Sequence, residues 1–169
     1  VYVEGQEVGS WMDWYPNGQL KCECYYSNGH KTGNYREYYE DGRKKKEAFY
    51  VDGQLNGVFH AWHRNGKKWH EIHFNNGIKH GRQDYWFENG EPSIESDYID
   101  GKRVGIYRSW HSNGQQEFEW HYKDGKRHGR SIDWSKEGVV LRDKRYKNGK
   151  GVSKERNNYY DDPDPDSLF

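Results

Sequence analysis

The sequence predicts an all-β fold, an antiparallel meander of about a dozen short strands that stack as β-hairpins. Three observations predict it. Glycines recur with a period of 24 residues, turn dipeptides divide the chain into strand-length segments, and helical periodicity is absent. A fixed period of this length is typical of repeat proteins, in which each unit contacts only its neighbours. We therefore expect an elongated body.

Nineteen of the 20 glycines belong to three series that share the 24-residue period. No insertion or deletion interrupts the series, so we expect the units to stack uniformly. The first series is Gly5, Gly29, Gly53, Gly77, Gly101, Gly125 and Gly149; the second is Gly9, Gly33, Gly57, Gly81, Gly105 and Gly129; the third is Gly18, Gly42, Gly66, Gly90, Gly114 and Gly138.

Aromatic and acidic residues form three further columns, and the unit becomes G-x-x-x-x-W-x-x-N-G-x-x-x-x-E-x-x-Y-x-x-G-x-x-x. Residues 1–150 hold six such repeats and partial terminal units, and residues 151–169 form an acidic tail rich in Pro and Asp. The tryptophan column is Trp14, Tyr38, Trp62, Trp86, Trp110 and Trp134; the tyrosine column is Tyr26, Tyr50, Phe74, Tyr98, Tyr122 and Tyr146; the acidic column is Glu23, Glu47, Glu71, Glu95, Glu119 and Asp143.

Two sets of turn dipeptides bound the strands of each unit. One set follows the tryptophan column, as at Asn113-Gly114, and the other follows the tyrosine column, as at Asp124-Gly125. Asn, Asp and Gly tolerate a positive φ, so both sets predict hairpin turns, with Glu137-Gly138 a weaker signal. The first set fits either two-residue loops or three-residue loops with a bulge. These two choices place Trp14 on opposite faces relative to Leu20.

Two strands per unit give a rise of roughly 10 Å and a body on the order of 60–70 Å long. The aromatic columns would stack in ladders, so that a narrow apolar stripe replaces a deep aliphatic core. Composition agrees, because hydrophobic residues make up only 31% of the chain while aromatic residues reach 17%. The aromatic content argues against disorder, and no run approaches the roughly 18 apolar residues of a membrane span.

The residues Trp110, Asn113-Gly114, Glu119, Tyr122 and Gly125 show the pattern in which the chain resembles the MORN repeat family, in its variant form. The resemblance covers residues 1–150 and implies an elongated, twisted antiparallel sheet of stacked β-hairpins. It also implies a scaffold or protein-interaction platform, with phosphoinositide contact proposed for some members. Similar arrays occur in bacterial proteins of the antitoxin type and in giant DNA viruses. The departures Glu137, Asp143 and Ser153 indicate that the array ends near residue 150.

The periodic residues are interpreted as structural, because a catalytic residue is needed once and these occur once per hairpin. We expect the acidic column to accept hydrogen bonds from backbone or hydroxyl groups. The alternative is a ladder of acid sites, but carboxylates about 10 Å apart could not share a cation or form a catalytic pair. No nucleophile motif, phosphate-cradling loop or dinucleotide fingerprint is present. We therefore predict no enzymatic activity and no cofactor.

Nine histidines raise a metal hypothesis. Three pairs lie 48 residues apart, for example His63 and His111, which places partners some 20 Å apart and indicates duplication of a two-repeat block. Only His60, His63, His70 and His73 are local to one hairpin, and we expect no metal there.

Cys22 and Cys24 are two residues apart on one predicted strand and point to the same face. They are poorly placed to pair, and there is no other cysteine. This usage predicts an intracellular, reducing location.

The neutral total of 27 basic and 27 acidic residues conceals an asymmetry. Residues 1–122 carry 15 basic and 18 acidic residues, for −3; residues 123–156 carry 12 and 5, for +7; the tail 157–169 has four aspartates, for −4. The basic segment is either a solvated cap of the sheet or a site for anionic lipid, nucleic acid or an acidic protein, unless the acidic tail folds over it. The anion-binding candidates are Arg127, Arg130, Lys144 and Lys147.

Aromatic residues outside the columns are not needed by the repeat, so they are candidates for partner contacts. They are Trp11, Trp69, Phe118 and Trp120. Leu168 and Phe169 at the end of the tail form a further candidate anchor pair. The chain begins at Val1 with half a hairpin, which favours additional sequence before it.

The leading functional hypothesis is a non-enzymatic scaffold that binds protein partners, as a component of a large assembly such as a virus particle. An antitoxin that binds a cognate toxin is one alternative, and a module for anionic lipid or nucleic acid is another. An aromatic-rich, choline-binding type of cell-wall repeat is less compatible with the Asn-Gly turns and the acidic column.

Overall fold

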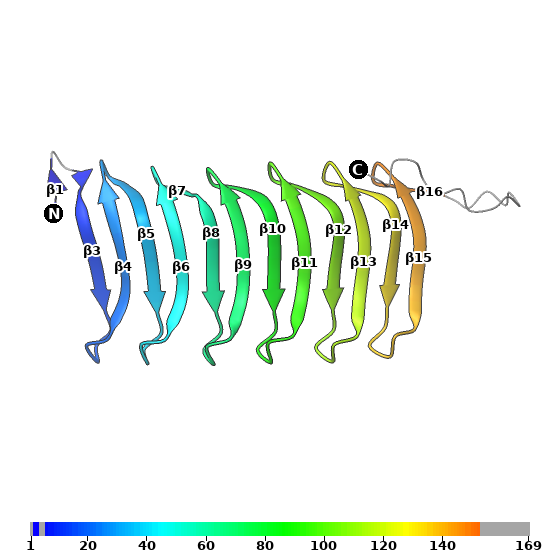
Figure 1. The fold of residues 1–169 in the computed structure, drawn as a ribbon, viewed down its shortest axis with the longest axis horizontal. Helices are drawn as coiled ribbons and strands as arrows, with labels where there is room; N and C mark the ends of the chain where they lie inside the picture. The colour runs from blue at the N-terminus through cyan, green and yellow to red at the C-terminus, as the bar shows by residue number, and fades with distance from the viewer. Residues whose placement is uncertain (1, 4–5, 153–169) are drawn as a thin grey trace, which may run out of the picture.

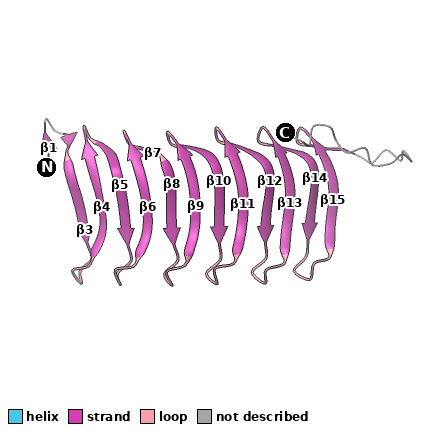
Figure 2. Ribbon diagram, viewed as in Figure 1, coloured by secondary structure: helices cyan, strands magenta, loops and turns pink. Residues whose placement is uncertain are grey.

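The computed structural model describes residues 2–3 and 6–152, and in this range the chain is all-β. A single antiparallel sheet of 14 strands forms the body, and consecutive strands are neighbours along it, except that β6 pairs with both the short β7 and β8 (Figures 1 and 2). The sheet is open, since β3 and β16 lie at opposite ends of the strand order. The predicted stack of hairpins is confirmed.

The strands are uniform in length, apart from short pieces at the two ends and at β7. In chain order they are β1 (Tyr2–Val3), β2 (Gln6–Glu7), β3 (Gly9–Trp14), β4 (Leu20–Ser27), β5 (His30–Tyr38), β6 (Lys44–Val51), β7 (Gln54–Leu55), β8 (Gly57–Trp62), β9 (Lys68–Asn75), β10 (Ile78–Trp86), β11 (Pro92–Ile99), β12 (Lys102–Trp110), β13 (Gln116–Lys123), β14 (Lys126–Trp134), β15 (Val140–Lys147) and β16 (Lys150–Val152). β1 and β2 pair only with each other.

The turns after the tyrosine column are two-residue hairpin loops. At Asn28-Gly29 both residues have a positive φ, 49° and 74°, and Ser27 pairs directly with His30. This is the type I′ turn, whose twist matches that of the strands it joins. Asn, Asp and Gly at these positions are therefore explained by the turn type.

The turns after the tryptophan column are three-residue loops with a bulge. In the first, Tyr15 N donates to Gln19 O at 2.8 Å and Gly18 N donates to Tyr15 O at 2.9 Å. Only Gly18 has a positive φ, 83°, so the tolerance of Asn17 for positive φ is not used. Asn17 Oδ1 instead accepts from Gln19 N at 3.0 Å. The register left open by the sequence is thus the bulged one.

The second glycine series lies at bulges inside the strands. The pairing of β4 with β5 shifts between Glu23 and Tyr25, beside Gly33, whose φ is +72°. Positive φ at each glycine of the series allows the extra residues to be accommodated where a side chain would be strained.

The two aromatic columns lie on opposite faces of the sheet, because strand side chains alternate. We call the face with the tyrosine column the tyrosine face and the other the tryptophan face. The apolar core is thin and lies mainly on the tyrosine face. Its buried residues are small or aliphatic: Cys22, Cys24, Ala48, Ala61, Ile72 and Ile132. Neither cysteine forms a disulfide in the described part of the chain, and the two share the tyrosine face as predicted.

Adjacent units are joined by hydrogen bonds that the sequence did not predict. In four units, the residue after the tryptophan-column position makes a side-chain hydrogen bond to the backbone of the next unit. Tyr39 Oη donates to Trp62 O at 2.7 Å, and His63 Nε2 lies 2.9 Å from Trp86 O. His63 and its counterpart His111 therefore replace tyrosines in this role. Among the described residues, no group of three or more His, Cys, Asp or Glu side chains could hold a metal ion.

Candidate functional site

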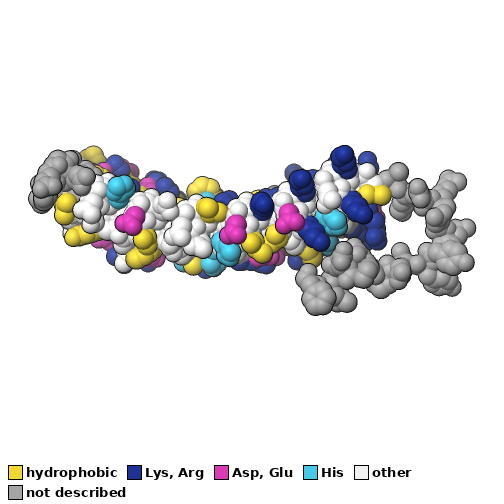
Figure 3. Space-filling view, turned by 90° about the horizontal axis from the view of Figure 1, so that it is seen from above, with side chains coloured by type: hydrophobic (Ala, Val, Ile, Leu, Met, Phe, Trp, Pro, Cys, Tyr) yellow, Lys and Arg dark blue, Asp and Glu magenta, His cyan; other side chains and the backbone are white. Residues whose placement is uncertain are grey.

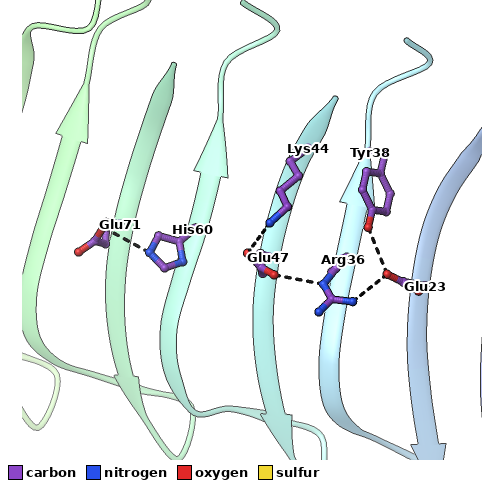
Figure 4. A network of polar contacts seen from close by, with 7 residues as sticks. All are labelled: Glu23, Arg36, Tyr38, Lys44, Glu47, His60 and Glu71. Atoms are coloured by element: carbon purple, nitrogen blue, oxygen red, sulfur yellow. Dashed lines mark hydrogen bonds and ion pairs between the residues drawn. The ribbon is translucent and has the colours of Figure 1, made fainter. Parts of the chain in front are cut away.

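A row of acidic and basic side chains crosses the tryptophan face from β4 to β13, with one residue from each strand except the short β7. Glu23 of β4 lies directly opposite Arg36 of β5, which lies opposite Glu47 of β6. Arg36 donates from Nη1 to Glu23 Oε1 and from Nε to Glu47 Oε1, both at 3.1 Å (Figure 4). Tyr38 Oη also donates to Glu23 Oε1 at 3.1 Å, and Lys44 Nζ to Glu47 Oε2 at 3.1 Å. The row links neighbouring units through side chains.

Later units repeat the arrangement, with histidine or arginine as the basic residue. His60 Nε2 lies 3.3 Å from Glu71 Oε2 (Figure 4), and Arg108 Nε donates to Glu119 Oε2 at 3.1 Å. On β14 the row position is occupied by Ile132, and Arg130, two residues earlier, binds Asp143 through two hydrogen bonds of 3.1 and 2.9 Å. We expected backbone or hydroxyl donors for the acidic column; the hydroxyl of Tyr38 is one such donor, but the cross-strand cations were not predicted. Their spacing was available, since Arg36 is 13 residues after Glu23 and 11 before Glu47.

The basic partners lower the pKa of several carboxyl groups in the row. Burial raises the pKa of Glu47, but the hydrogen bonds from Arg36 and Lys44 outweigh burial and hold it below its ordinary value. For Glu71 the hydrogen bond from Lys68 is the largest influence and lowers the pKa. These carboxylates are therefore charged and paired at neutral pH, which suits a structural row.

Asp84 interrupts the alternation. It occupies the place of Arg36 and Arg108 in the row and lies between two other acids, opposite Glu71 on one side and Glu95 on the other. Burial raises the pKa of Asp84, and Glu95 and Glu71 add to the rise, while the hydrogen bond from Arg82 at 2.8 Å lowers it. Like charges directly opposite each other in a sheet are destabilising. Arg82 also forms an ion pair with Glu95 at 2.9 Å, so one guanidinium offsets part of the repulsion among the three carboxylates in the middle of the rod.

Cations also line the tyrosine face, between successive members of the tyrosine column. The guanidinium of Arg103 lies 5.5 Å from the ring centre of Tyr98 and 5.0 Å from that of Tyr122, and it donates to both hydroxyls. Arg127 lies 3.6 Å from the ring centre of Trp120 and 5.3 Å from that of Tyr146. The predicted apolar stripe therefore also contains cations, and Tyr50, Tyr98, Tyr122 and Tyr146 of the tyrosine column gain cation–π attraction.

A family model for the MORN repeat variant matches residues 7–28, 31–52 and 103–124. The chain carries MORN-variant repeats. The intervening residues 53–102 and the following residues 125–148 form hairpins of the same strand order and turn geometry as the matched ones. No curated protein matches the chain in a sequence search.

MORN repeats are generally non-enzymatic modules that mediate interactions with proteins or membrane lipids. In the described part of the chain, no helix is long and apolar enough to cross a bilayer.

The four aromatic partner candidates differ in exposure. Trp11 and Trp69 are 44% and 45% exposed. Phe118 and Trp120 are partly buried, and their ring centres lie 4.4 Å apart. Trp120 also stacks on Tyr107 at 5.3 Å and donates from Nε1 to Asp133 Oδ1 at 2.7 Å, so it has a place in the packing of the tyrosine face. Leu168 and Phe169 lie outside the described residues. A partner role for all six stays a prediction.

The anion-binding candidates gather at the C-terminal end of the MORN-variant array, where Lys and Arg side chains dominate the surface (Figure 3). They are engaged to different degrees. Arg127 lies against Trp120, and Arg130 is bound to Asp143. Lys144 and Lys147 are exposed on β15 and make no ion pair with another described residue. Their role as anion ligands also stays a prediction.

Proposed function

We propose that the chain is a non-enzymatic scaffold whose MORN-variant sheet binds protein partners, as part of a larger assembly. The observation that carries the proposal is the exposure of Trp11, Trp14 and Trp69, at 44%, 54% and 45%. Tryptophan is the residue type most enriched at the energetic centres of protein interfaces. Among the described residues no second layer covers either face of the sheet, so a partner could reach these rings.

Site-specific photo-crosslinking tests this proposal. A photoreactive phenylalanine analogue replaces Trp11 or Trp69 in turn, and Ile78 or Ile99, which are 52% and 53% exposed, in control proteins. We expect the two tryptophan positions to crosslink a defined partner that the control positions do not. Trp11→Ala and Trp69→Ala should then weaken binding of that purified partner while leaving the melting temperature nearly unchanged. Equal crosslinking from all four positions would contradict the proposal.

Two narrower roles belong to the same proposal. As a component of a virus particle, the chain would copurify with intact particles at fixed stoichiometry after nuclease and detergent treatment. As an antitoxin, it would restore growth of cells that express a toxin encoded beside it. The absence of a toxic neighbour would remove the second role without affecting the first.

We propose an intracellular, reducing location. The support is that neither Cys22 nor Cys24 forms a disulfide in the described structure, and that both are buried, at 8% and 7% exposure. Burial also raises the pKa of the Cys22 thiol, which keeps it in its unreactive protonated form. Alkylation of denatured protein taken directly from its source should label both thiols. A disulfide or mixed disulfide at either would contradict the location.

A further inference from the structure

We propose that the tyrosine face from β9 to β15 binds an acidic α-helix of a partner protein, which lies along the rod axis. The inference rests on the proposed function, because it names the kind of protein partner. The first observation is a cation in each of three successive units, directly opposite an aromatic ring of the tyrosine column. The opposed pairs are Lys79 and Phe74, Arg103 and Tyr98, and Arg127 and Tyr122. Residues directly opposite each other share a face, so all three cations lie on the tyrosine face.

The repeat does not require these three cations. At the equivalent place Leu55 lies opposite Tyr50, and Gly151 lies opposite Tyr146. Every ion pair that involves the described strands β9 to β15 uses another basic residue. The Nε of Arg103 is buried and has no hydrogen-bond partner. The three cations therefore have no carboxylate partner in the described part of the chain.

The three cations recur at a constant step. In each case the carbonyl oxygen of the cationic residue accepts a hydrogen bond of 2.8 or 2.9 Å from the turn glycine of the next unit, which is Gly101, Gly125 or Gly149. Neighbouring cations thus occupy equivalent positions two strands apart, which is about 10 Å. The outer two cations are separated by twice this distance.

The surroundings of the cations are aromatic and basic. On the described tyrosine face from β9 to β15, no Asp or Glu occurs in the row of the three cations or in the next row. That next row holds Tyr107 and Trp120, whose rings stack at 5.3 Å, and the exposed Lys144. The acids of neighbouring positions lie outside both rows, in turns or towards the tryptophan-column turns: Asp100, Asp124, Glu117 and Asp133. The two rows are therefore complementary in charge to an acidic partner.

The spacing of the cations favours a helix over an extended chain. An α-helix rises 1.5 Å per residue, so seven residues advance about 10.5 Å and make nearly two turns, which returns a side chain to the same side. Carboxylates at positions i, i+7 and i+14 therefore match the three cations. In an extended strand, side chains on one side are about 6.6 Å apart, and a residue about 10 Å away points to the other side. A helix with its side chains is about 10 Å wide, which covers both rows, since they are about 7 Å apart.

Fluorescence anisotropy with labelled synthetic peptides tests the proposal on the full chain. The first peptide is a helix of alanine and glutamine with glutamates at i, i+7 and i+14. The second has the same composition, but its middle glutamate is moved two positions, which turns it to the opposite side of the helix. We expect the first peptide to bind about 2- to 5-fold more tightly at low salt, which is the effect of one ion pair. The difference should shrink as salt is added.

Substitution of the middle cation links this preference to the site. Arg103→Leu removes the cation, and Leu55 shows that the repeat accommodates leucine at this position. The variant should bind both peptides equally, whereas Arg103→Lys should keep a preference for the first. The matched control is Lys31→Leu, at the same position in a unit outside the three, opposite Tyr26. It should behave as the unaltered chain does.

Equal affinity of the two peptides for the unaltered chain would overturn the site, as would the same loss in Lys31→Leu as in Arg103→Leu. A proline-rich peptide with glutamate at every third residue advances about 9 Å per turn, and its tighter binding would replace the helix by an extended occupant. Absence of binding by every peptide would also remove the helix site. That result would leave the protein-partner proposal standing, because crosslinking from Trp11 and Trp69 tests it separately.

Discussion

The hydroxyl of Tyr39 offers the most direct test of how neighbouring units are joined. It donates to Trp62 O at 2.7 Å in a partly buried place, and the equivalent Tyr15 donates to Tyr38 O at 2.9 Å. Phe87 occupies the same position two units after Tyr39 and has no hydroxyl. The chain thus contains units with this hydrogen bond and a unit without it. One substitution can therefore remove the bond and lower the stability, and another can add it and raise the stability.

We expect Tyr39→Phe to lower the free energy of unfolding by about 1 kcal/mol, because it removes one hydrogen bond and leaves a partly buried carbonyl without that donor. Phe87→Tyr should raise it by a similar or smaller amount by donating to the carbonyl of Trp110. For a domain of this size, 1 kcal/mol corresponds to a shift in melting temperature of about 2–4 °C.

Thermal and urea unfolding followed by circular dichroism measure both changes. The two positions are 48 residues apart and share no partner, so the double variant should lie close to the unaltered chain. A Tyr39→Phe variant of unchanged stability, or a Phe87→Tyr variant that is destabilised, would refute the idea that these side chains join the units.

Four further predictions concern backbone strain and pH. Gly33→Ala should destabilise by about 1–2 kcal/mol because φ is +72°, although a Cβ there meets nothing within 4 Å; Gly151→Ala, where φ is not positive, should change urea unfolding little. Burial lowers the pKa of His70 to about 4, and His63 and Lys46 add to the shift. The free energy of unfolding should therefore fall as the pH drops from about 6.5 towards 4. In urea titrations, His70→Phe should make this fall smaller. Asp84→Asn should raise the urea midpoint at pH 7, because the charged form is disfavoured in the folded state, and the gain should vanish on acidification below the ordinary pKa of 3.8. Glu37→Gln is the opposite case, because hydrogen bonds from Lys45 and Lys46 outweigh burial and lower the pKa of Glu37; it should lower the urea midpoint at pH 7.

The sequence predicted the fold well because the turn residues carry their own conformational preference. Asn28-Gly29 has the positive φ values expected of its dipeptide. The dipeptide Asn17-Gly18 is identical, yet it forms a bulged loop in which only the glycine is left-handed. Local sequence cannot distinguish the two, because loop length depends on how the flanking strands pair.

The side-chain network was harder to predict than the fold. The acidic column was visible, but its partners Arg36, His60 and Arg108 vary in type and so form no column of their own. They became apparent only when the register placed them opposite Glu23, Glu71 and Glu119.

The hydrogen bonds that tie each tyrosine-column turn to the previous one recur at a constant separation of 22 residues, as from Gly53 N to Lys31 O and from Gly101 N to Lys79 O. Each unit therefore advances along the rod by the same step. Two ligands held at different units are kept apart by a whole number of steps of about 10 Å. Deleting or duplicating one 24-residue block would change that distance by one step and leave both binding surfaces intact. The number of units between two binding surfaces therefore sets the distance between their ligands.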